Sequence, residues 1–232
     1  MTGPSIGTKT HKSEKTKRKI INAYLDLIPM KKWDKISVKE ISAQANITRG
    51  TFYQYFSDIF DLMEHIETTL MTDLKKRYSS IHKIEPTTFN PELFIKKFDY
   101  NPPEVFYSWF NFCIEHKKSI TVLLDPKHGD TYFVKKLKVI LTEYISKMMD
   151  ADGMPRDNLR ETFVKVFIEL HFLSARAWLS STDENPLLTT DEIINVLNTM
   201  RVGASYLSYR RLVCPDPNDK MKFPDGTDKN CC

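Results

Sequence analysis

The stretch of this chain best suited to chemistry is Thr48-Arg49-Gly50-Thr51-Phe52-Tyr53-Gln54. Small, polar or cationic residues at its start allow a backbone to come close to base edges and phosphates. Arg49 can pair with a guanine edge or a phosphate, and Gln54 can pair with adenine. Gly50 adds no bulk, although glycine inside a helix costs about 1 kcal/mol relative to alanine. These residues predict a surface that reads duplex DNA.

A short helix over residues 37–45 is predicted to precede that stretch. Ser37 can cap its N-terminus, and Glu40 stands three residues later, which is the spacing of a capping box. The N-terminal amides of such a helix attract a phosphate, and Lys39 adds a positive charge beside them.

The reading stretch is predicted to be a second helix with the same kind of start. Thr48 can cap it, and Ile47 and Phe52 can form a hydrophobic staple across the cap. Asn46 lies between the two helices and tolerates the left-handed conformation that a sharp turn needs. Two short helices joined by so tight a turn form a helix-turn-helix.

Positive charge is concentrated near the N-terminus. Residues 1–60 carry a net charge of +6, whereas residues 61–232 carry −2. Residues 9–19 hold six cations and one acid. Such a run is often only a solvated tail, but a basic head on a near-neutral body suggests a polyanionic partner. Lys17 and Lys19 are predicted to meet the DNA backbone or its counterions.

Residues 20–66 resemble the DNA-binding domain of the TetR family of bacterial transcription regulators. The segment Lys31–Ser37 is similar to a subgroup of dihydroxyacetone-kinase regulators. Three sites depart from the family pattern: Lys32 and Asn46 stand where many members have glycine, and Ile59 stands where a lysine often touches phosphate. The residues that carry the resemblance are Ser37, Val38, Ile41, Ile47, Thr48, Gly50, Thr51, Phe52, Tyr53, Tyr55 and Phe56.

The resemblance implies a ligand-responsive repressor that binds a palindromic operator as a homodimer. Two alternatives remain open: a family member that acts as a coactivator or binds a partner protein, and a helical ligand-binding protein without a DNA role. The operator, the effector and the sign of regulation are not encoded in these motifs. The predicted DNA-binding residues are Lys17, Lys19, Ser37, Val38, Lys39, Thr48, Arg49, Gly50, Thr51, Tyr53 and Gln54.

The hydrophobic periodicity predicts an all-α chain of about nine helices. We expect a disordered basic arm over 1–12, the helix-turn-helix domain over 13–58, a regulatory and dimerisation body over 59–213 and a disordered tail over 214–232. The predicted helices outside the reading motif cover residues 14–28, 58–83, 92–99, 104–118, 130–149, 157–180 and 191–211.

The helical body is rich in aromatic residues, which usually form plain core. Polar residues among them could orient an effector, and the last two helices could pair with those of a second copy. The candidate pocket residues are Trp109, Phe112, Cys113, His116, Phe133, Phe167 and His171. The candidate dimer residues are Phe167, Leu170, Ala177, Trp178, Val196, Met200, Gly203 and Leu207.

Enzymatic and membrane functions find no support in the sequence. The chain has no HExxH motif, phosphate-cradling glycine loop or nucleophile elbow, and its six histidines form no metal or catalytic pattern. We therefore predict a protein that is not an enzyme and needs no cofactor or metal. No apolar run approaches a membrane span, and the cysteines lack a disulfide spacing, so we expect a cytoplasmic protein.

Overall fold

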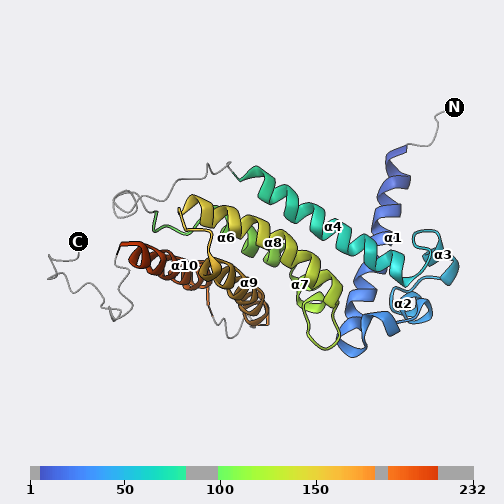
Figure 1. Ribbon diagram of the computed structural model, residues 1–232. Coiled ribbons are helices and arrows are strands. Elements are labelled where there is room, and N and C mark those ends of the chain that lie inside the picture. Colours follow the sequence, from blue (N-terminus) through green and yellow to red (C-terminus); the bar gives the residue numbers. More distant parts are fainter. Residues whose placement is uncertain (1–5, 82–98, 181–187, 214–232) are drawn as a thin grey trace. The chain divides into compact units, whose positions relative to one another are not determined.

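A computed structural model describes residues 6–81, 99–180 and 188–213. Within these ranges the chain forms nine α-helices, two short 3-10 helices and no strand (Figure 1). This confirms the predicted all-α fold. The 3-10 helices span Ile28–Met30 and Trp33–Lys35. The α-helices are α1 Ile6–Leu27, α2 Val38–Gln44, α3 Arg49–Tyr53, α4 Ile59–Ser80, α6 Glu104–Glu115, α7 Lys117–Leu123, α8 Thr131–Ala151, α9 Asn158–Leu179 and α10 Thr190–Val213.

Two observed helices differ from the predicted pattern. Helix α1 begins at Ile6, inside the segment 1–12 for which we predicted a disordered arm. Extending a helix that is already formed costs far less than starting one, so α1 continues from its buried face into this segment. The predicted helix 104–118 is divided into α6 and α7, because His116 leaves helical geometry with φ −104° and ψ 25°. The predicted helix 92–99 and the tail 214–232 lie outside the described residues, apart from residue 99.

The chain divides into two compact units. Unit 1 contains residues 1–76 and 112–137, and unit 2 contains residues 77–111 and 138–232. Unit 1 therefore extends beyond the predicted boundary at residue 58. It includes most of α4 and a segment from the middle of the chain.

The core of unit 1 forms around one face of α1. Ile20 and Tyr24 of α1 and Ile28, the first residue of the following 3-10 helix, recur every four residues, and each is completely buried. The Tyr24 hydroxyl donates to the Trp33 carbonyl at 3.2 Å, and the Trp33 amide donates to the His128 carbonyl at 3.3 Å. These two bonds join the helix-turn-helix region to the loop between α7 and α8.

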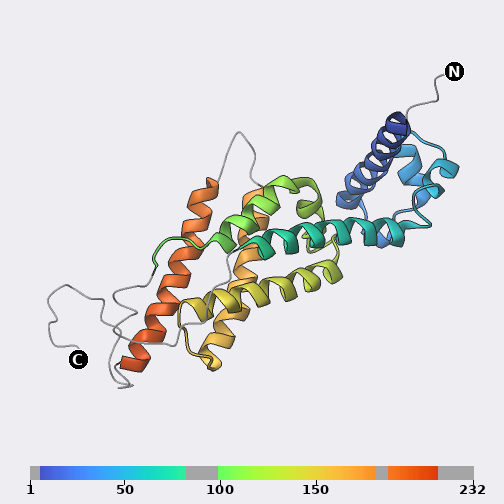
Figure 2. The same cartoon turned by 90° about the horizontal axis from the view of Figure 1, so that it is seen from above.

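The core of unit 2 is aromatic, with α6 packed against α9. Phe106 meets Phe167 with ring centroids 5.7 Å apart, and Trp109 meets Phe172 at 5.5 Å. Helices α9 and α10 lie side by side in both views (Figures 1 and 2). One face of each helix therefore packs inside the unit, and the opposite face is exposed.

Arg201, one of two buried arginines in the described part of unit 2, organises much of its polar interior. Arg201 of α10 is 3% exposed, and it donates to both carboxylate oxygens of Asp152. Its remaining donors bind the carbonyls of Asp99 and Asn101 and the side chain of Asn198. All five guanidinium N–H groups are satisfied, so this buried charge fixes residues 99–101 against α10.

Candidate nucleic-acid interface

Helix α2 starts with the predicted capping box. The Glu40 amide donates to Ser37 Oγ at 3.3 Å, and the Ser37 amide donates to Glu40 Oε2 at 2.7 Å. Hydrogen bonds to the Glu40 carboxylate from the Ser37 hydroxyl (2.6 Å) and then the Ser37 amide, followed by one from Lys31, lower the pKa of Glu40 to about 2. The carboxylate is thus ionised throughout the neutral range and holds the helix start in place. Lys39 is exposed beside it and makes no ion pair within the described residues.

The turn into α3 uses the one positive φ found at a non-glycine residue in the described ranges, 51° at Asn46. The next amide, that of Ile47, donates back to the Ser42 carbonyl at 3.0 Å. Thr48 then caps α3 by accepting from the Thr51 amide at 3.1 Å. Phe52 is completely buried and anchors this five-residue helix to the core. Cap and anchor together compensate for the weak helix propensity of the segment.

The remaining residues of α3 face outward. Arg49, Gly50 and Gln54 are exposed, and Tyr53 is 57% exposed. Arg49 forms no ion pair with any residue that the structure describes. Its guanidinium is therefore available to a partner outside the chain. Thr51 is half-buried, with its hydroxyl 2.9 Å from that of Thr48.

No neighbour among the described residues requires glycine at position 50. A Cβ there would meet only Thr48 Oγ1, at the ordinary contact distance of 3.7 Å. Gly50 also lies in regular helix and not among the residues of positive φ. The glycine therefore weakens its helix without relieving crowding among the described residues, and it leaves this exposed turn without a side chain.

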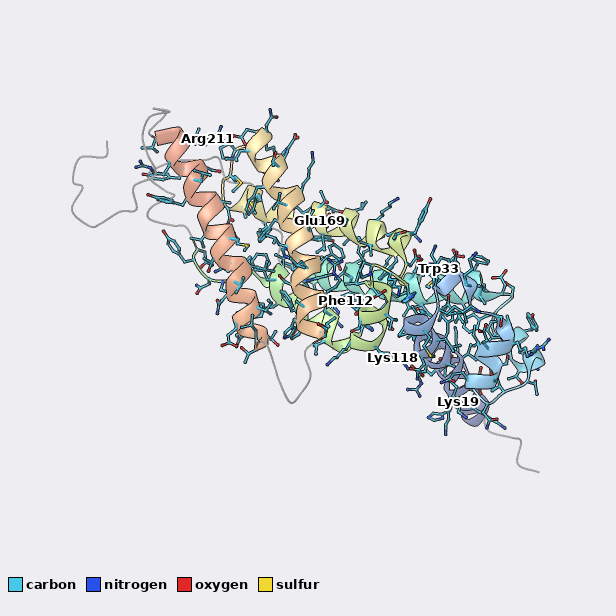
Figure 3. The ribbon with its side chains drawn as sticks, turned by 90° about the horizontal axis from the view of Figure 1, so that it is seen from below. Lys19, Trp33, Phe112, Lys118, Glu169 and Arg211 are labelled. Atoms are coloured by element: carbon cyan, nitrogen blue, oxygen red, sulfur yellow. The ribbon has the colours of Figure 1, made fainter. Side chains whose placement is uncertain are left out.

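The predicted backbone-contacting lysines lie on α1. Lys19 is exposed at the outer edge of the helix (Figure 3). Lys17 is half-buried, with its Nζ 5.8 Å from the centre of the Phe56 ring, which follows α3. The same ring lies 5.7 Å from that of His65, whose pKa is lowered by burial and then by Lys17. Lys17 therefore stands at the edge of the α3 surface.

The candidate pocket residues are divided between the units. Trp109, Phe167 and His171 belong to unit 2, and Phe112, Cys113, His116 and Phe133 belong to unit 1. All except His116 are essentially buried.

Among these pocket residues, His171 and His116 each have a hydrogen-bond partner, and Cys113 is buried. His171 Nδ1 lies 2.7 Å from the Phe167 carbonyl, and burial lowers the pKa of His171 to about 4. His116 Nε2 lies 2.9 Å from Asp73 of α4. Burial raises the pKa of the Cys113 thiol well above its ordinary value. His171 is therefore neutral near pH 7, and Cys113 is a protonated thiol.

Four of the candidate dimer residues line one groove in unit 2. This apolar groove of about 470 Å³ lies between α9 and α10. Of the other candidates, Ala177 and Val196 are exposed, Trp178 donates its indole N–H to the Leu188 carbonyl at 3.1 Å, and Phe167 is buried in the unit. None of the candidate pocket residues lines the groove. Its lining is Met154, Leu159, Phe163, Leu170, Met200, Gly203, Ala204, Tyr206, Leu207 and Ser208.

The candidate dimer residues did not include the groove residues Leu159 and Phe163. The signal that indicates them is the spacing of an outward stripe on α9: residues 159, 163, 166, 170, 173 and 177 alternate between steps of four and three. That spacing is typical of helices that pack along a seam. Helix α10 carries the matching stripe 196, 200, 203 and 207.

The described residues offer neither a metal site nor a membrane span. No group of three histidine, cysteine, aspartate or glutamate side chains in these ranges suits a metal ion. Each helix in the same ranges is too short or too polar to cross a lipid bilayer.

Comparison with known proteins agrees with the geometry. Residues 20–66 match the family model of bacterial regulatory proteins of the tetR family. A TetR-family transcriptional regulator from Streptomyces coelicolor shares the fold with a TM-score of 0.54 and 20% identity, over 89% of this chain and 91% of its own. A TetR transcriptional regulator from Streptococcus agalactiae gives 0.51 and 19%, over 84% of this chain and 98% of its own. A search of curated proteins finds no match.

The family match covers the helices built above, from the buried face of α1 to the middle of α4. It includes the capping box, the turn at Asn46 and the exposed start of α3. The wider likeness extends the same all-α fold over most of the chain. Residues 20–66 are therefore a TetR-family helix-turn-helix domain, and the chain as a whole shares the all-α fold of TetR-family transcription regulators.

Proposed function

We propose that this chain is a repressor that binds a palindromic operator as a homodimer and releases it when a small molecule binds. The DNA-reading part rests on one observation above the others. At the first turn of α3, Arg49 is exposed and unpaired within the described residues, beside a glycine that the chain's own packing does not require.

In this proposal each outward residue of α3 contacts the part of the DNA that suits its chemistry. Arg49 pairs with a guanine edge or a phosphate, and Gln54 pairs with adenine in the major groove. The exposed Tyr53 hydroxyl donates to a phosphate. Thr48 and Thr51 support this turn, and Gly50 lets its backbone approach the bases.

Residues outside α3 supply backbone contacts in this proposal. Ser37, Val38 and Lys39 form the start of α2, where the cap is already rigid and Lys39 adds an exposed charge. Lys17 and Lys19 add cations from α1. These contacts set the orientation of the domain on the duplex and carry no sequence information themselves.

Selection of bound sequences from a random duplex pool tests this function. We expect enrichment of a palindrome whose two related half-sites lie about one helical turn or a multiple apart. A single motif without a repeat would contradict binding of the operator by a homodimer. The absence of any enriched motif would contradict DNA reading itself.

The homodimer is supported by the outward stripes of α9 and α10. Leu173 and Val166 of α9 are 54% and 53% exposed, and Val196 and Met200 of α10 are 43% and 39% exposed. Apolar residues at seam spacing on two adjacent helices suit the same two helices of a second copy, which gives a four-helix interface. We expect sedimentation equilibrium to give twice the mass of one chain. A monomer at micromolar concentration would contradict this part of the proposal.

Release by an effector requires a ligand that binds one conformation more tightly than another. Trp109, Phe112, Cys113, His116, Phe133, Phe167 and His171 remain our candidates for its surroundings. A ligand found by thermal-shift screening should raise the melting temperature and weaken operator binding. By linkage, operator DNA should weaken ligand binding by the same factor. A partner protein that releases the operator, with no such ligand, would instead support the coactivator or partner-binding alternative.

A further inference from the structure

The start of α4 is closed to anions by its own side chains. Asp58 Oδ1 accepts from the amides of Phe60 and Asp61, both at 2.8 Å. Asp61 Oδ2 in turn accepts from the Ser57 amide at 2.8 Å. Two carboxylates therefore occupy a helix end that would otherwise attract phosphate, and the apolar Ile59 opens the helix. This part of the domain repels the DNA backbone.

The N-terminal half of α1 has the opposite character. Lys12, Lys15 and Lys19 are all exposed and stand three and then four residues apart, which places them on one stripe of the helix. Arg18 is exposed beside this stripe. Within the described residues none of these four side chains forms an ion pair, so their charge is not neutralised by that part of the chain.

This basic stripe, defined as Lys12, Lys15, Arg18 and Lys19, lies just before the residues that match the family model. The family match begins at Ile20, directly after the stripe, while α1 runs without a break from Ile6 to Leu27. Figure 1 shows α1 continuing past α2 and α3 toward its N-terminus. The stripe is thus carried on a rigid helix and not on a loose arm.

The position of Lys17 places the stripe next to the reading surface. Lys17 lies on the inner side of the same helical turns, with its Nζ over the Phe56 ring at 5.8 Å. Phe56 follows α3 by three residues, so the stripe starts at the edge of the surface that α3 presents. From Lys12 to Lys19 the helix rises about 10 Å, the length of roughly three base pairs.

We propose that the basic stripe of α1 binds backbone phosphates beside the base pairs read by α3, and that it takes this role in place of the start of α4. The inference rests on the proposed DNA-reading function and deepens it. It predicts that each head contacts a longer stretch of duplex DNA than the helix-turn-helix alone would contact. The contacts are electrostatic, so they strengthen binding to any sequence and add no base specificity.

The test compares the wild-type protein with the variant Lys12→Gln/Lys15→Gln/Lys19→Gln on two duplexes. One duplex ends at the selected operator, and the other extends it by about one helical turn (~10 base pairs) on each side. On the extended duplex the variant's salt slope should be smaller by about two to three per head. Over a fourfold rise in salt, wild type should lose roughly 40-fold more affinity per head than the variant. On the trimmed duplex, where only Lys19 at the edge of the operator still meets a phosphate, the two salt slopes should differ by no more than about one per head.

A matched control removes the same charge elsewhere in unit 1. Lys117, Lys127 and Lys135 are exposed, and their replacement by glutamine should leave affinity and salt slope on the extended duplex close to wild type. A loss equal to that of the stripe variant would mean that net charge alone acts, which overturns the proposal. Circular dichroism should give similar melting curves for all three proteins, because the substituted side chains are exposed.

Failure of this inference is distinguishable from failure of DNA reading. If wild type enriches a palindrome and Arg49→Ala loses it, while the stripe variant keeps its affinity and slope on the extended duplex, the stripe does not bind DNA. A stripe that binds an acidic protein surface would give that same result and likewise overturns the proposal. If wild type retains no duplex at all, both the reading function and the stripe proposal fail.

Discussion

Gly50 in unit 1 and Gly203 in unit 2 both lie within a helix, but the neighbours of Gly50 are polar and those of Gly203 are apolar. Each lies in a helix, and neither is required by internal packing: a Cβ at Gly50 meets only Thr48 Oγ1, and a Cβ at Gly203 meets nothing within 4 Å. Gly50 is surrounded by threonine and arginine, whereas Gly203 lies in an apolar groove with Leu170 and Leu207. Under the proposed function, the same residue type clears space for a polyanion in one unit and for an apolar surface in the other.

The units also differ in how they bury charge. In unit 2, Arg201 and Asp152 form an ion pair whose arginine has every donor satisfied. In unit 1, Glu67 of α4 is 4% exposed, bonds to Lys136 and lies within hydrogen-bonding reach of Asp130. One cation therefore serves two buried carboxyl groups, which favours a proton on one of them.

The largest effect is expected from a charge placed in the apolar groove. Leu207→Glu should dissociate the dimer by at least 100-fold, because a desolvated carboxylate without a partner costs about 3 kcal/mol or more. Sedimentation velocity across a concentration series measures the shift. Val139→Glu is the matched control, since Val139 is 70% exposed in unit 2 and lies outside the groove. Equal dissociation by both variants, or by neither, would remove the groove from the interface.

The next effect concerns the buried carboxyl of unit 1. Burial first, and then the hydrogen bond with Asp130, raise the pKa of Glu67 to about 7, against the opposing bond from Lys136. Because the folded-state value is raised, the stability from protonated Glu67 is fully present below its ordinary pKa of 4.5. It is lost as pH rises through about 7.

We expect the free energy of unfolding to fall by on the order of 2 kcal/mol between about pH 5 and pH 8. Urea titrations at several pH values measure this slope. Glu67→Gln keeps a neutral hydrogen-bonding side chain and should flatten the slope. The other groups that face the pair are Tyr24 of α1, Asp34, and Glu64 of α4. An unchanged slope in the variant would place the titration elsewhere.

A smaller loss is expected at the reading surface. Arg49→Ala should cost about 1–3 kcal/mol of specific binding, concentrated at one base position of the half-site. Fluorescence anisotropy with single-base variants of the operator resolves that position. Lys39→Ala should weaken all sequences to the same extent. Equal losses on operator and random DNA for both variants would refute the assignment of α3 as the reading helix.

The smallest effects sharpen the comparison of the glycines directly. Gly50→Ala and Gly203→Ala should each stabilise their helix by about 0.5–1 kcal/mol, since neither new methyl group meets a clash. Gly50→Ala should weaken operator binding and leave dimerisation unchanged, and Gly203→Ala should do the reverse. Thermal melts, anisotropy and sedimentation on the same two variants separate these outcomes. If a variant is more stable and keeps both operator binding and dimerisation, its glycine has no role at either interface.

Prediction from sequence succeeded where short-range chemistry decides the structure. The capping box of Ser37, the cap at Thr48 and the turn at Asn46 act over three or four residues, and all three are present. The helices of the body also agree with their periodicity to within a few residues. The division of 104–118 at His116 was not predicted, because no proline or glycine marks it.

The sequence predicted the candidate interface residues less well, because burial decides which apolar residues face the core and which face a partner. Phe167 and Leu170 stand on the same apolar helix, yet Phe167 is buried in the unit and Leu170 lines the groove. Both faces of α9 are apolar, so hydrophobicity alone cannot assign one to the core and one to a partner. The seam spacing of the outward stripe becomes meaningful only when the inward face is known.

By itself the sequence determined the helices, their caps and the polar first turn of α3, because those depend on neighbouring residues. Only the tertiary structure decided that Glu67 is buried beside Asp130, that a Cβ at Gly50 would meet only the side chain of its own cap, and that α9 and α10 share an outward apolar groove. Those features depend on segments distant in the sequence, and burial exists only once such segments have packed together.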